Sequence, residues 1–201
     1  MFNITIKNIL FNIWPMIVIM TVILSSVRIT SIIKNKEKFI LYDELLKLGF
    51  LIYIISLFYV VTFQDVSWST SNFIPFKEMF RYRLFSSMFF KNVIGNMIMF
   101  MPYGFFISYI LKLDKKKIVF TLSILVSLTI ETTQLVIGRV FDVDDIILNV
   151  LGGLIGYFIY RLITKIQSHL PSFLKNNCFY NIIVSGLVIL ILVYIYRIVG
   201  V

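Results

Sequence analysis

Six long apolar stretches constrain this chain of 201 residues more than any other feature of its sequence. A helix needs about 20 mostly apolar residues to cross the hydrocarbon core of a bilayer. Hydrocarbon offers no partner for free backbone N–H and C=O groups, so each stretch is expected to form an α-helix. The sequence therefore predicts an all-α, polytopic membrane protein with about six transmembrane helices, at 9–33, 45–63, 92–113, 118–137, 146–164 and 181–199.

The composition agrees with burial in lipid. Hydrophobic residues make up 59% of the chain, whereas soluble domains average roughly 45–50%. Alanine is absent, so close contacts between helices must use glycine, serine or threonine. No long soluble segment or low-complexity linker interrupts the stretches, and residues 1–201 are predicted to form a single membrane domain. The first stretch has a thin basic flank at Lys7 and no small-residue cleavage site after it, so we expect a retained helix and not a signal peptide.

Several function classes are excluded or disfavoured by the sequence. The net charge of +9 could indicate nucleic-acid binding, but the basic residues flank the apolar stretches instead of forming one stripe, so no nucleic-acid partner is expected. Cys178 is the only cysteine and His169 the only histidine, which rules out an intrachain disulfide and multi-histidine metal motifs. The chain also lacks the G-x-S-x-G, P-loop and H-E-x-x-H motifs. We expect no metal and no cofactor.

Lysine and arginine counts predict the orientation in the membrane. Six spans place the loops 28–47, 112–117 and 161–175 on one side with twelve basic residues, and leave seven on the other side. Positive charge marks the cytoplasmic side, so these three loops are predicted to lie inside and both termini outside. The 64–91 loop is then outside, where its aromatic residues suit the membrane interface: Trp68, Phe73, Phe76 and Phe80.

The most unusual polar residue lies near the end of an apolar stretch. Glu131 is predicted about 10 Å below Gly138 along the helix, and it shares a helix face with Gln134. A carboxylate inside a span costs free energy unless it meets a partner or water, which makes it a functional candidate by default. The alternative is a structural hydrogen bond or ion pair with Arg139 or Asn96.

Acidic residues also open the next apolar stretch. Asp142, Asp145 and Asn149 are three and four apart, on one face of the predicted helix. Capping and the helix dipole favour aspartate at a helix start, but this explains only one or two of the aspartates here. A hard cation held by Asp142, Asp144 or Asp145 is an alternative, for which D-x-D-D alone is weak support. On the predicted topology, these side chains and Glu131 lie in the outer half of the membrane.

Glycine and proline indicate how the helices pack. Gly152 and Gly156 form a G-x-x-x-G pattern with Gly153 between them, which is typical of close helix contact. Pro102 is predicted to kink its span, and Gly104 would add room beside it. A packing kink and a binding crevice are both compatible with this proline.

Taken together, three segments resemble the VanZ family of bacterial membrane proteins. They are "NFIPF", "NVIGNMIMFMPYGF" and "ETTQLVIGRVFDVDDIILNVLGGLIGY". The resemblance covers roughly residues 12–163 as a VanZ-like core of five helices, with 181–199 as an additional C-terminal transmembrane helix. It implies these signature positions: Asn72, Pro75, Phe76, Asn96, Pro102, Gly104, Glu131, Gln134, Arg139, Asp142, Asp145, Asn149 and Gly153.

The resemblance implies a bacterial cytoplasmic membrane protein linked to reduced susceptibility to teicoplanin and related lipoglycopeptides, with no established reaction. Together with the polar cluster, it favours an outward pocket that binds membrane lipid, a lipid-linked cell-wall precursor or a lipoglycopeptide. A membrane enzyme acting on a phosphate- or sugar-bearing lipid, with Glu131 as acid or base, is the alternative. A transporter is disfavoured because its polar residues would lie near the midplane.

Overall fold

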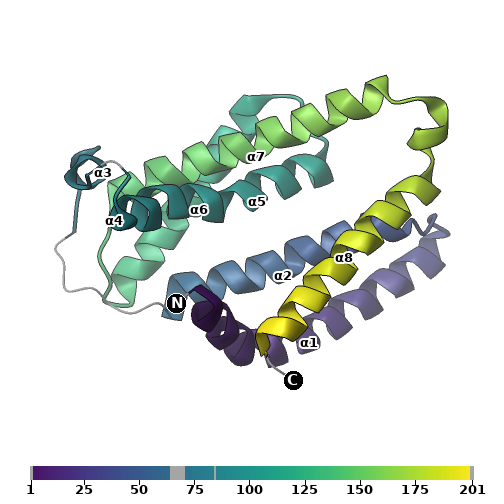
Figure 1. The fold of residues 1–201 in the computed structure, drawn as a ribbon, viewed down its shortest axis with the longest axis horizontal. Coiled ribbons are helices and arrows are strands. Elements are labelled where there is room, and N and C mark those ends of the chain that lie inside the picture. The colour runs from purple at the N-terminus through teal and green to yellow at the C-terminus, as the bar shows by residue number, and fades with distance from the viewer. Residues whose placement is uncertain (1, 64–70, 84, 200–201) are drawn as a thin grey trace. The chain divides into compact units, whose positions relative to one another are not determined.

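The computed structural model describes residues 2–63, 71–83 and 85–199, and most of these residues are helical (Figure 1). Six of the helices are long and apolar enough to cross a membrane. The prediction of an all-α, polytopic membrane protein is therefore confirmed. The six membrane-crossing segments are Phe11–Asn35, Leu41–Thr62, Ser87–Leu111, Lys116–Val136, Val143–His169 and Asn177–Arg197.

The helices follow the predicted order and differ from the prediction mainly at their ends. Two short helices precede the third span, a π-helical turn continues the second of them, and a 3-10 turn precedes the last span. In chain order the elements are α1 (Phe2–Asn35), α2 (Leu41–Phe63), α3 (Lys77–Arg81), α4 (Ser87–Phe89), the π turn (Phe90–Ile94), α5 (Gly95–Leu111), α6 (Lys116–Val136), α7 (Val143–His169), the 3-10 turn (Ser172–Lys175) and α8 (Asn177–Val199).

The chain divides into two compact units, each with membrane-crossing helices. Unit 1 comprises Met1–Val60 and His169–Val201, and it contains α1, most of α2, and α8. Unit 2 comprises Val61–Ser168 and contains α3 to α7. The single membrane domain expected over residues 1–201 stays a prediction.

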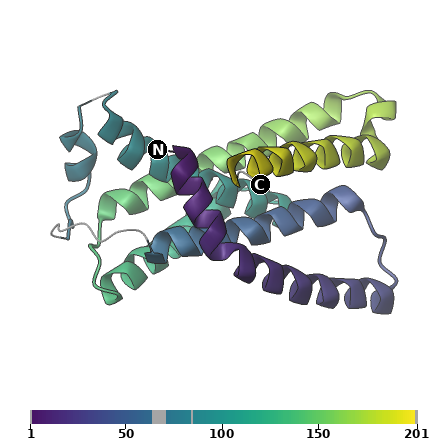
Figure 2. The ribbon, with the colours of Figure 1, turned by 60° about the horizontal axis from the view of Figure 1, so that its bottom comes forward.

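In unit 1, α1 and α2 form a hairpin joined by a short turn (Figure 2). Near the turn, Arg28 of α1 donates to Glu44 of α2, with an Nη2 to Oε1 distance of 2.8 Å. Farther along the hairpin, Asn12 Nδ2 donates to the Tyr59 hydroxyl at 2.7 Å. These polar contacts tie together two helices whose remaining surfaces are mostly apolar.

In unit 2, α6 turns one row of residues inward. Val119, Ser123, Ser127 and Glu131 follow one another at intervals of four residues, and all four are buried. Residues four apart share a helix face, and the small serines let neighbouring helices approach closely. The opposite side of α6 is exposed and carries Leu125 and Leu128 together with Thr121 and Thr132.

Glycines set the contact between α5 and α7. A methyl group on Gly152 would lie 2.2 Å from the carbonyl oxygen of Met97, and one on Gly156 would lie 2.0 Å from that of Met101. A methyl group on Gly104 would lie 1.8 Å from the carbonyl oxygen of Gly153. Any side chain at these positions would collide with the backbone of the other helix, so the close contact of α5 with α7 requires glycine at each of them.

The third span begins earlier than residue 92, where the sequence placed its start. Ser86 caps α4 by accepting the Phe89 N–H through its hydroxyl, at 3.1 Å. The chain then continues through the π turn into α5 without a break, and Pro102 lies inside α5 without ending it. A π turn inserts an extra residue per turn and so changes which residues face inward beyond it.

Candidate functional site

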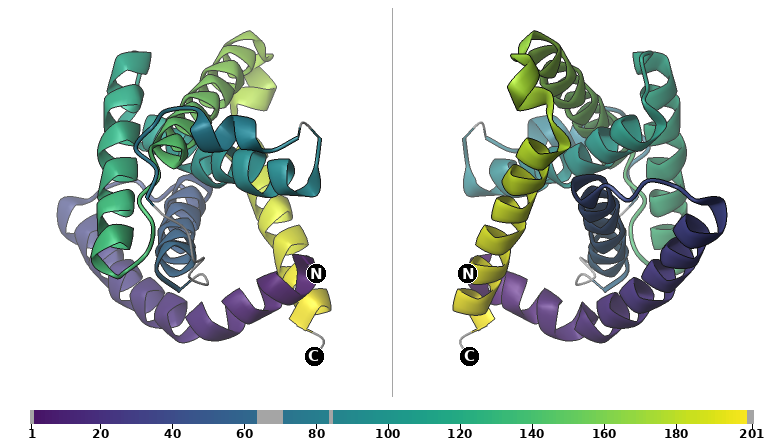
Figure 3. Two further views of the ribbon diagram at one scale, coloured as in Figure 1. Left: turned by 90° about the vertical axis from the view of Figure 1, so that its left-hand side faces the viewer. Right: turned by 90° about the vertical axis from the view of Figure 1, so that its right-hand side faces the viewer.

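The site lies at one end of unit 2, where α6 ends, α7 begins and the segment 71–81 runs close by (Figure 3, left). Gly138 terminates α6 in the left-handed conformation, with φ of 83°. The N–H of Gly138 donates to Leu135 O at 3.2 Å, and that of Arg139 to Gln134 O at 2.8 Å. These two bonds are those of a Schellman motif. The resulting reversal carries the chain back toward the side chain of Glu131.

An isolated parallel bridge joins the segment 71–81 to the start of α7. The Asn72 N–H donates to Phe141 O at 2.8 Å, and the Val143 N–H donates to Asn72 O at 3.0 Å. The side chains of the two bridged residues also bond to each other, since Asn72 Nδ2 donates to Asp142 Oδ1 at 2.9 Å. Asn72 and Asp142 are 70 residues apart in the chain, and the bridge makes them neighbours.

Asp144 is the anchor of this segment. Its carboxylate accepts the backbone N–H of Phe76, that of Glu78 at 2.7 Å and that of Met79 at 3.0 Å. Phe76 has a left-handed φ of 67°, a conformation that costs free energy for a residue with a side chain. Three charge-assisted hydrogen bonds to one buried carboxylate compensate that cost and hold the segment against α7.

Glu131 is buried and bonded within the protein. Its Oε2 accepts the Asp142 backbone N–H at 2.9 Å. With the Gln134 amide oriented to satisfy both its atoms, Gln134 donates to Glu131 Oε1 at 3.2 Å and accepts from Arg139 Nη1 at 3.2 Å. Arg139 also donates to the Val61 carbonyl. Glu131 and Arg139 are therefore connected through Gln134 and make no direct ion pair.

Asp145 differs from Asp144 because it is only half-buried and only partly bonded. Asn96, placed just after the π turn, donates its Nδ2 to Asp145 Oδ1. The second carboxylate oxygen, Oδ2, has no hydrogen bond to any residue that the structure describes. A carboxylate oxygen in this position remains available to a donor from outside the protein.

Asn149 extends the polar residues one turn deeper into the unit. Its Nδ2 donates to Ser127 Oγ at 2.9 Å, and both residues are buried. Asn149 Oδ1 and Ser123 Oγ have no partner among the described residues. Buried polar atoms of this kind are usually satisfied by ordered water, which marks the α6–α7 contact as a polar interior.

Asp142 lies in the loop before α7, outside the membrane-crossing segments. Burial raises the pKa of its carboxyl above the ordinary value, and the charges of Asp144 and Glu78 act in the same direction. The hydrogen bonds from Asn72 and from the Asp144 N–H oppose that increase in pKa. Burial therefore disfavours the ionised form of the Asp142 carboxyl, and the two hydrogen bonds partly offset this effect.

The surface around the site is aromatic and basic. The side chains of Phe73, Phe76 and Phe80 are exposed, and Phe73 stacks on Phe141 with ring centroids 5.3 Å apart. Trp68, expected to lie in the same surface, falls outside the described residues. Lys77 and Arg83 are exposed on this segment, whereas Arg81 pairs with Glu78 at 3.0 Å. An apolar, basic rim thus adjoins the acidic cluster.

The structure brings together most of the site residues that the sequence indicated. Asn72, Asn96, Glu131, Gln134, Arg139, Asp142, Asp145 and Asn149 all lie at this end of unit 2 or one turn below it, with Pro75 and Phe76 on the bridged segment. Across the described ranges, no three His, Cys, Asp or Glu side chains are arranged to hold a metal ion.

Sequence reasoning underestimated Asp144 and Ser127. The sequence offers a helix-start role or a cation ligand for the aspartates here, yet Asp144 is 1% exposed and binds three backbone N–H groups. Ser127 was not singled out, yet it holds Asn149. The spacing of Ser127 four residues before Glu131 was a usable signal. No local pattern indicated that Asp144 would bind a segment almost 70 residues away.

Comparison with known proteins places this unit in a family. A family model described as VanZ/LLP1 matches residues 50–164, from within α2 to the last part of α7. The matched segment covers more than half of the chain, and it starts later than the resemblance over 12–163 implied. Neither a curated protein nor a solved structure matches this chain.

Proposed function

The chain belongs to the VanZ/LLP1 family of membrane proteins, and from that premise we propose that it binds the headgroup of a lipid-linked cell-wall component or of a lipoglycopeptide. The binding site in this proposal is the acidic end of unit 2, on the outer face of the bacterial cytoplasmic membrane. By occupying or altering the display of such headgroups, the protein would lower susceptibility to teicoplanin-type antibiotics.

The observation that carries the proposal is the half-buried carboxylate of Asp145. One of its oxygens is held by Asn96, and the other is uncommitted within the described part of the chain. A carboxylate at the start of a membrane-crossing helix is costly to bury without a partner. A ligand that presents hydroxyl, amide or ammonium donors would supply that partner, and sugar and peptide headgroups present all three.

The surroundings of Asp145 suit an amphipathic ligand. Glu131, Asp142 and Asp144 are committed to holding the chain reversal and the bridged segment, so they fix the position of Asp145. The exposed phenylalanines beside them can contact an acyl or polyprenyl chain. A lipid with a polar, donor-rich headgroup would therefore meet a rigid acidic surface and an apolar rim at the same depth.

The test compares two aspartate-to-asparagine variants in one expression host. In Asp145→Asn the side-chain oxygen still accepts from Asn96, so we expect normal membrane abundance with loss of the co-purified precursor lipid and of the effect on teicoplanin susceptibility. The control is Asp114→Asn, an exposed aspartate in the loop between α5 and α6, which should leave both readouts unchanged. The proposal fails if Asp145→Asn keeps wild-type lipid and wild-type susceptibility.

Glu131→Gln provides a second arm of the same test. Glutamine can still accept the Asp142 N–H, and a turn of the Gln134 amide can restore their mutual bond. Neutralising a buried charge held near a functional site is often neutral or stabilising. We expect this variant to accumulate at least as well as wild type and to lose the bound lipid, because removing the charge changes the acidic surface that the ligand meets.

A further inference from the structure

A cavity of about 400 Å³ lies between α1 and α2 in unit 1. Eight of its twelve lining residues are apolar, among them Leu24 and Ile32 from α1 and Leu45, Leu48 and Leu51 from α2. Its volume falls in the range of pockets that hold small organic ligands, about 300–1,000 Å³. The cavity is open to its surroundings, since Ile29 and Phe39 of its lining are exposed. An open apolar cavity between two membrane helices is suited to a hydrocarbon chain that enters from the bilayer.

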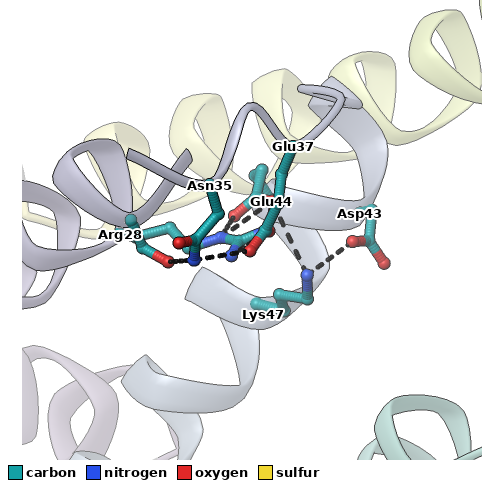
Figure 4. Close-up of polar contacts among 7 residues, drawn as sticks. Arg28, Asn35, Glu37, Asp43, Glu44 and Lys47 are labelled. Carbon is teal, nitrogen blue, oxygen red and sulfur yellow. Dashed lines mark hydrogen bonds and ion pairs between the residues drawn. The ribbon is translucent and has the colours of Figure 1, made fainter. Parts of the chain in front are cut away.

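A cluster of charges lies beside this cavity (Figure 4). Arg28 Nη1 donates to Glu37 Oε2 at 2.7 Å, and Arg28 Nη2 and Nε donate to Glu44 at 2.8 and 3.1 Å. Lys47 Nζ pairs with Asp43 Oδ2 at 2.6 Å and lies 3.6 Å from Glu44 Oε1. These contacts connect the last turns of α1 with the first turns of α2.

Two of the three charged side chains that line the cavity are basic. Arg28, Lys47 and Glu44 line it, whereas Glu37 and Asp43 do not. A guanidinium carries five N–H groups and an ammonium three; within the described residues, two of the first and at least one of the second have no acceptor. Each Glu44 oxygen is already held by Arg28, whereas unused N–H groups remain on Arg28 and Lys47. The polar wall therefore favours an anionic group rich in oxygen.

The adjoining turn adds further positive charge. Lys34, Lys36 and Lys38 are exposed on both sides of Glu37, and none of them forms an ion pair with a described residue. On the predicted topology this turn is cytoplasmic. The cytoplasmic leaflet carries anionic lipids, and basic residues near the membrane surface attract them.

We propose that this cavity binds one anionic phospholipid, with an acyl chain between α1 and α2 and its phosphate hydrogen-bonded to Arg28 and Lys47. The site is separate from the acidic end of unit 2. Its lining runs from Leu24 to Leu51, so it lies almost entirely before the family-matched segment. It is a lipid site of this chain's own N-terminal hairpin.

Two adjacent serines of α1 give a matched test. Ser25 lines the cavity, whereas Ser26 is exposed and does not. The full-length protein is purified in detergent, incubated with phosphatidylglycerol or phosphatidylcholine, and its bound lipid is measured by native mass spectrometry. Wild type and Ser26→Phe should retain phosphatidylglycerol in preference to phosphatidylcholine. Ser25→Phe fills the cavity and should lose the retained phosphatidylglycerol.

Lys47→Gln tests the polar wall without filling the cavity. It should weaken phosphatidylglycerol binding about tenfold, the loss expected for one charge-assisted hydrogen bond. Lys112→Gln, an exposed lysine in unit 2, is its control and should bind as wild type does. This arm also decides the matter if Ser25→Phe is not monodisperse on size exclusion.

Three results would overturn the proposal. One is full retention of phosphatidylglycerol by a folded Ser25→Phe variant, which would mean that the acyl chain does not occupy this cavity. Another is equal retention of the two lipids by wild type. The third is equally tight binding of glycerophosphoglycerol, the headgroup without chains, which would assign the polar wall to a soluble phosphate compound. None of these results bears on Asp145, so the proposal for unit 2 stands or fails separately.

Discussion

Asp144 and Asp145 are adjacent in the sequence and differ in what their carboxylates do. Asp144 is 1% exposed and bonded to three backbone N–H groups of the segment that includes α3. Asp145 points toward Asn96 and keeps one oxygen uncommitted within the described residues. At the scale of single residues, one aspartate therefore stabilises the site, and the other is positioned to meet a ligand.

This difference predicts that the same substitution lowers abundance at one position and not at the other. Asparagine has one acceptor oxygen where aspartate has two, so Asp144→Asn leaves at least one of the three N–H groups facing an amide. The lost charge-assisted hydrogen bonds should cost about 2–3 kcal/mol, and membrane abundance should fall. Asp145→Asn should accumulate normally. Quantitative immunoblotting of membranes from both variants, made in parallel, measures the contrast, and equal abundance of the two would contradict it.

The raised pKa of Asp142 predicts that the stability of the protein depends on pH. Burial raises the pKa of its carboxyl in the folded protein, so the folded state binds a proton more tightly than the unfolded state does. This contribution to stability is fully present below the unfolded pKa, near pH 4, and it is lost as the pH rises through the folded pKa. Wild type should therefore lose stability over that window.

Asp142→Asn is the control for this pH dependence. The two donors to Asp142, Asn72 Nδ2 and the Asp144 N–H, share one oxygen, which asparagine retains. The variant should show a flatter stability profile and, at neutral pH, at least wild-type stability. Thermal unfolding in detergent at several pH values from 4 to 8 (roughly the window in which aspartates with raised pKa titrate) checks this. Parallel profiles for the two proteins would contradict the assignment.

At the scale of elements, the contact between α5 and α7 depends on the absence of side chains. Methyl groups on Gly152 and Gly156 would lie 2.2 Å and 2.0 Å from backbone oxygens of α5. Backbone cannot move aside as a flexible side chain can. The two helices are thus held at a separation that only glycine permits, and this separation sets where Asn96 meets α7.

Gly156→Ala should therefore destabilise the protein, and Gly152→Leu or Gly156→Leu should do so more strongly. Overpacking of this kind costs about 1–3 kcal/mol. Gly186→Ala in α8 is the matched control, because a methyl group there meets nothing within 4 Å and alanine is the better helix former. The measurement is the unfolding temperature in detergent. If Gly156→Ala and Gly186→Ala unfold alike, the close contact is not formed.

At the scale of the whole molecule, the remaining question is orientation. Alternating spans place the segment 71–83 and the turn before α7 on one side, and the bridge between Asn72 and Asp142 requires the same. The Lys115–Lys117 run lies at the opposite end of α6. The basic residues number twelve on the side of that run and seven on the other, which predicts that the acidic end faces outward.

Single cysteines test this orientation. In a Cys178→Ser background, Ser71→Cys should react with a membrane-impermeant thiol reagent on intact cells, and Lys116→Cys should react only after the cells are permeabilised. Both positions belong to unit 2, so one experiment orients the whole unit. Labelling of Lys116→Cys alone on intact cells would invert the topology and move the acidic end to the cytoplasm.

The sequence by itself determined the six membrane-crossing helices, because in lipid each backbone group must find its partner within its own segment. The predicted end of the fourth stretch, at residue 137, lies within one residue of the end of α6 at Val136. The sequence also singled out most of the polar residues that meet at this end of unit 2, because a charged residue inside an apolar stretch costs free energy unless it has a partner. These features depend on residues close together in the sequence, so the sequence alone can predict them.

Only the tertiary structure decided which hydrogen-bond donor pairs with which carboxylate. Glu131 could have paired with Arg139 or Asn96, and instead it accepts the N–H of Asp142, while Asn96 holds Asp145. Asp144 binds a segment almost 70 residues earlier, and two apolar faces of α1 and α2 leave a cavity where they could have interlocked. Partner choice among several carboxylates depends on small differences in distance. Those distances result from three features together: the chain reversal at Gly138, the π turn before Asn96 and the glycine contact of α5 with α7. A pattern within one short segment cannot indicate their combined effect.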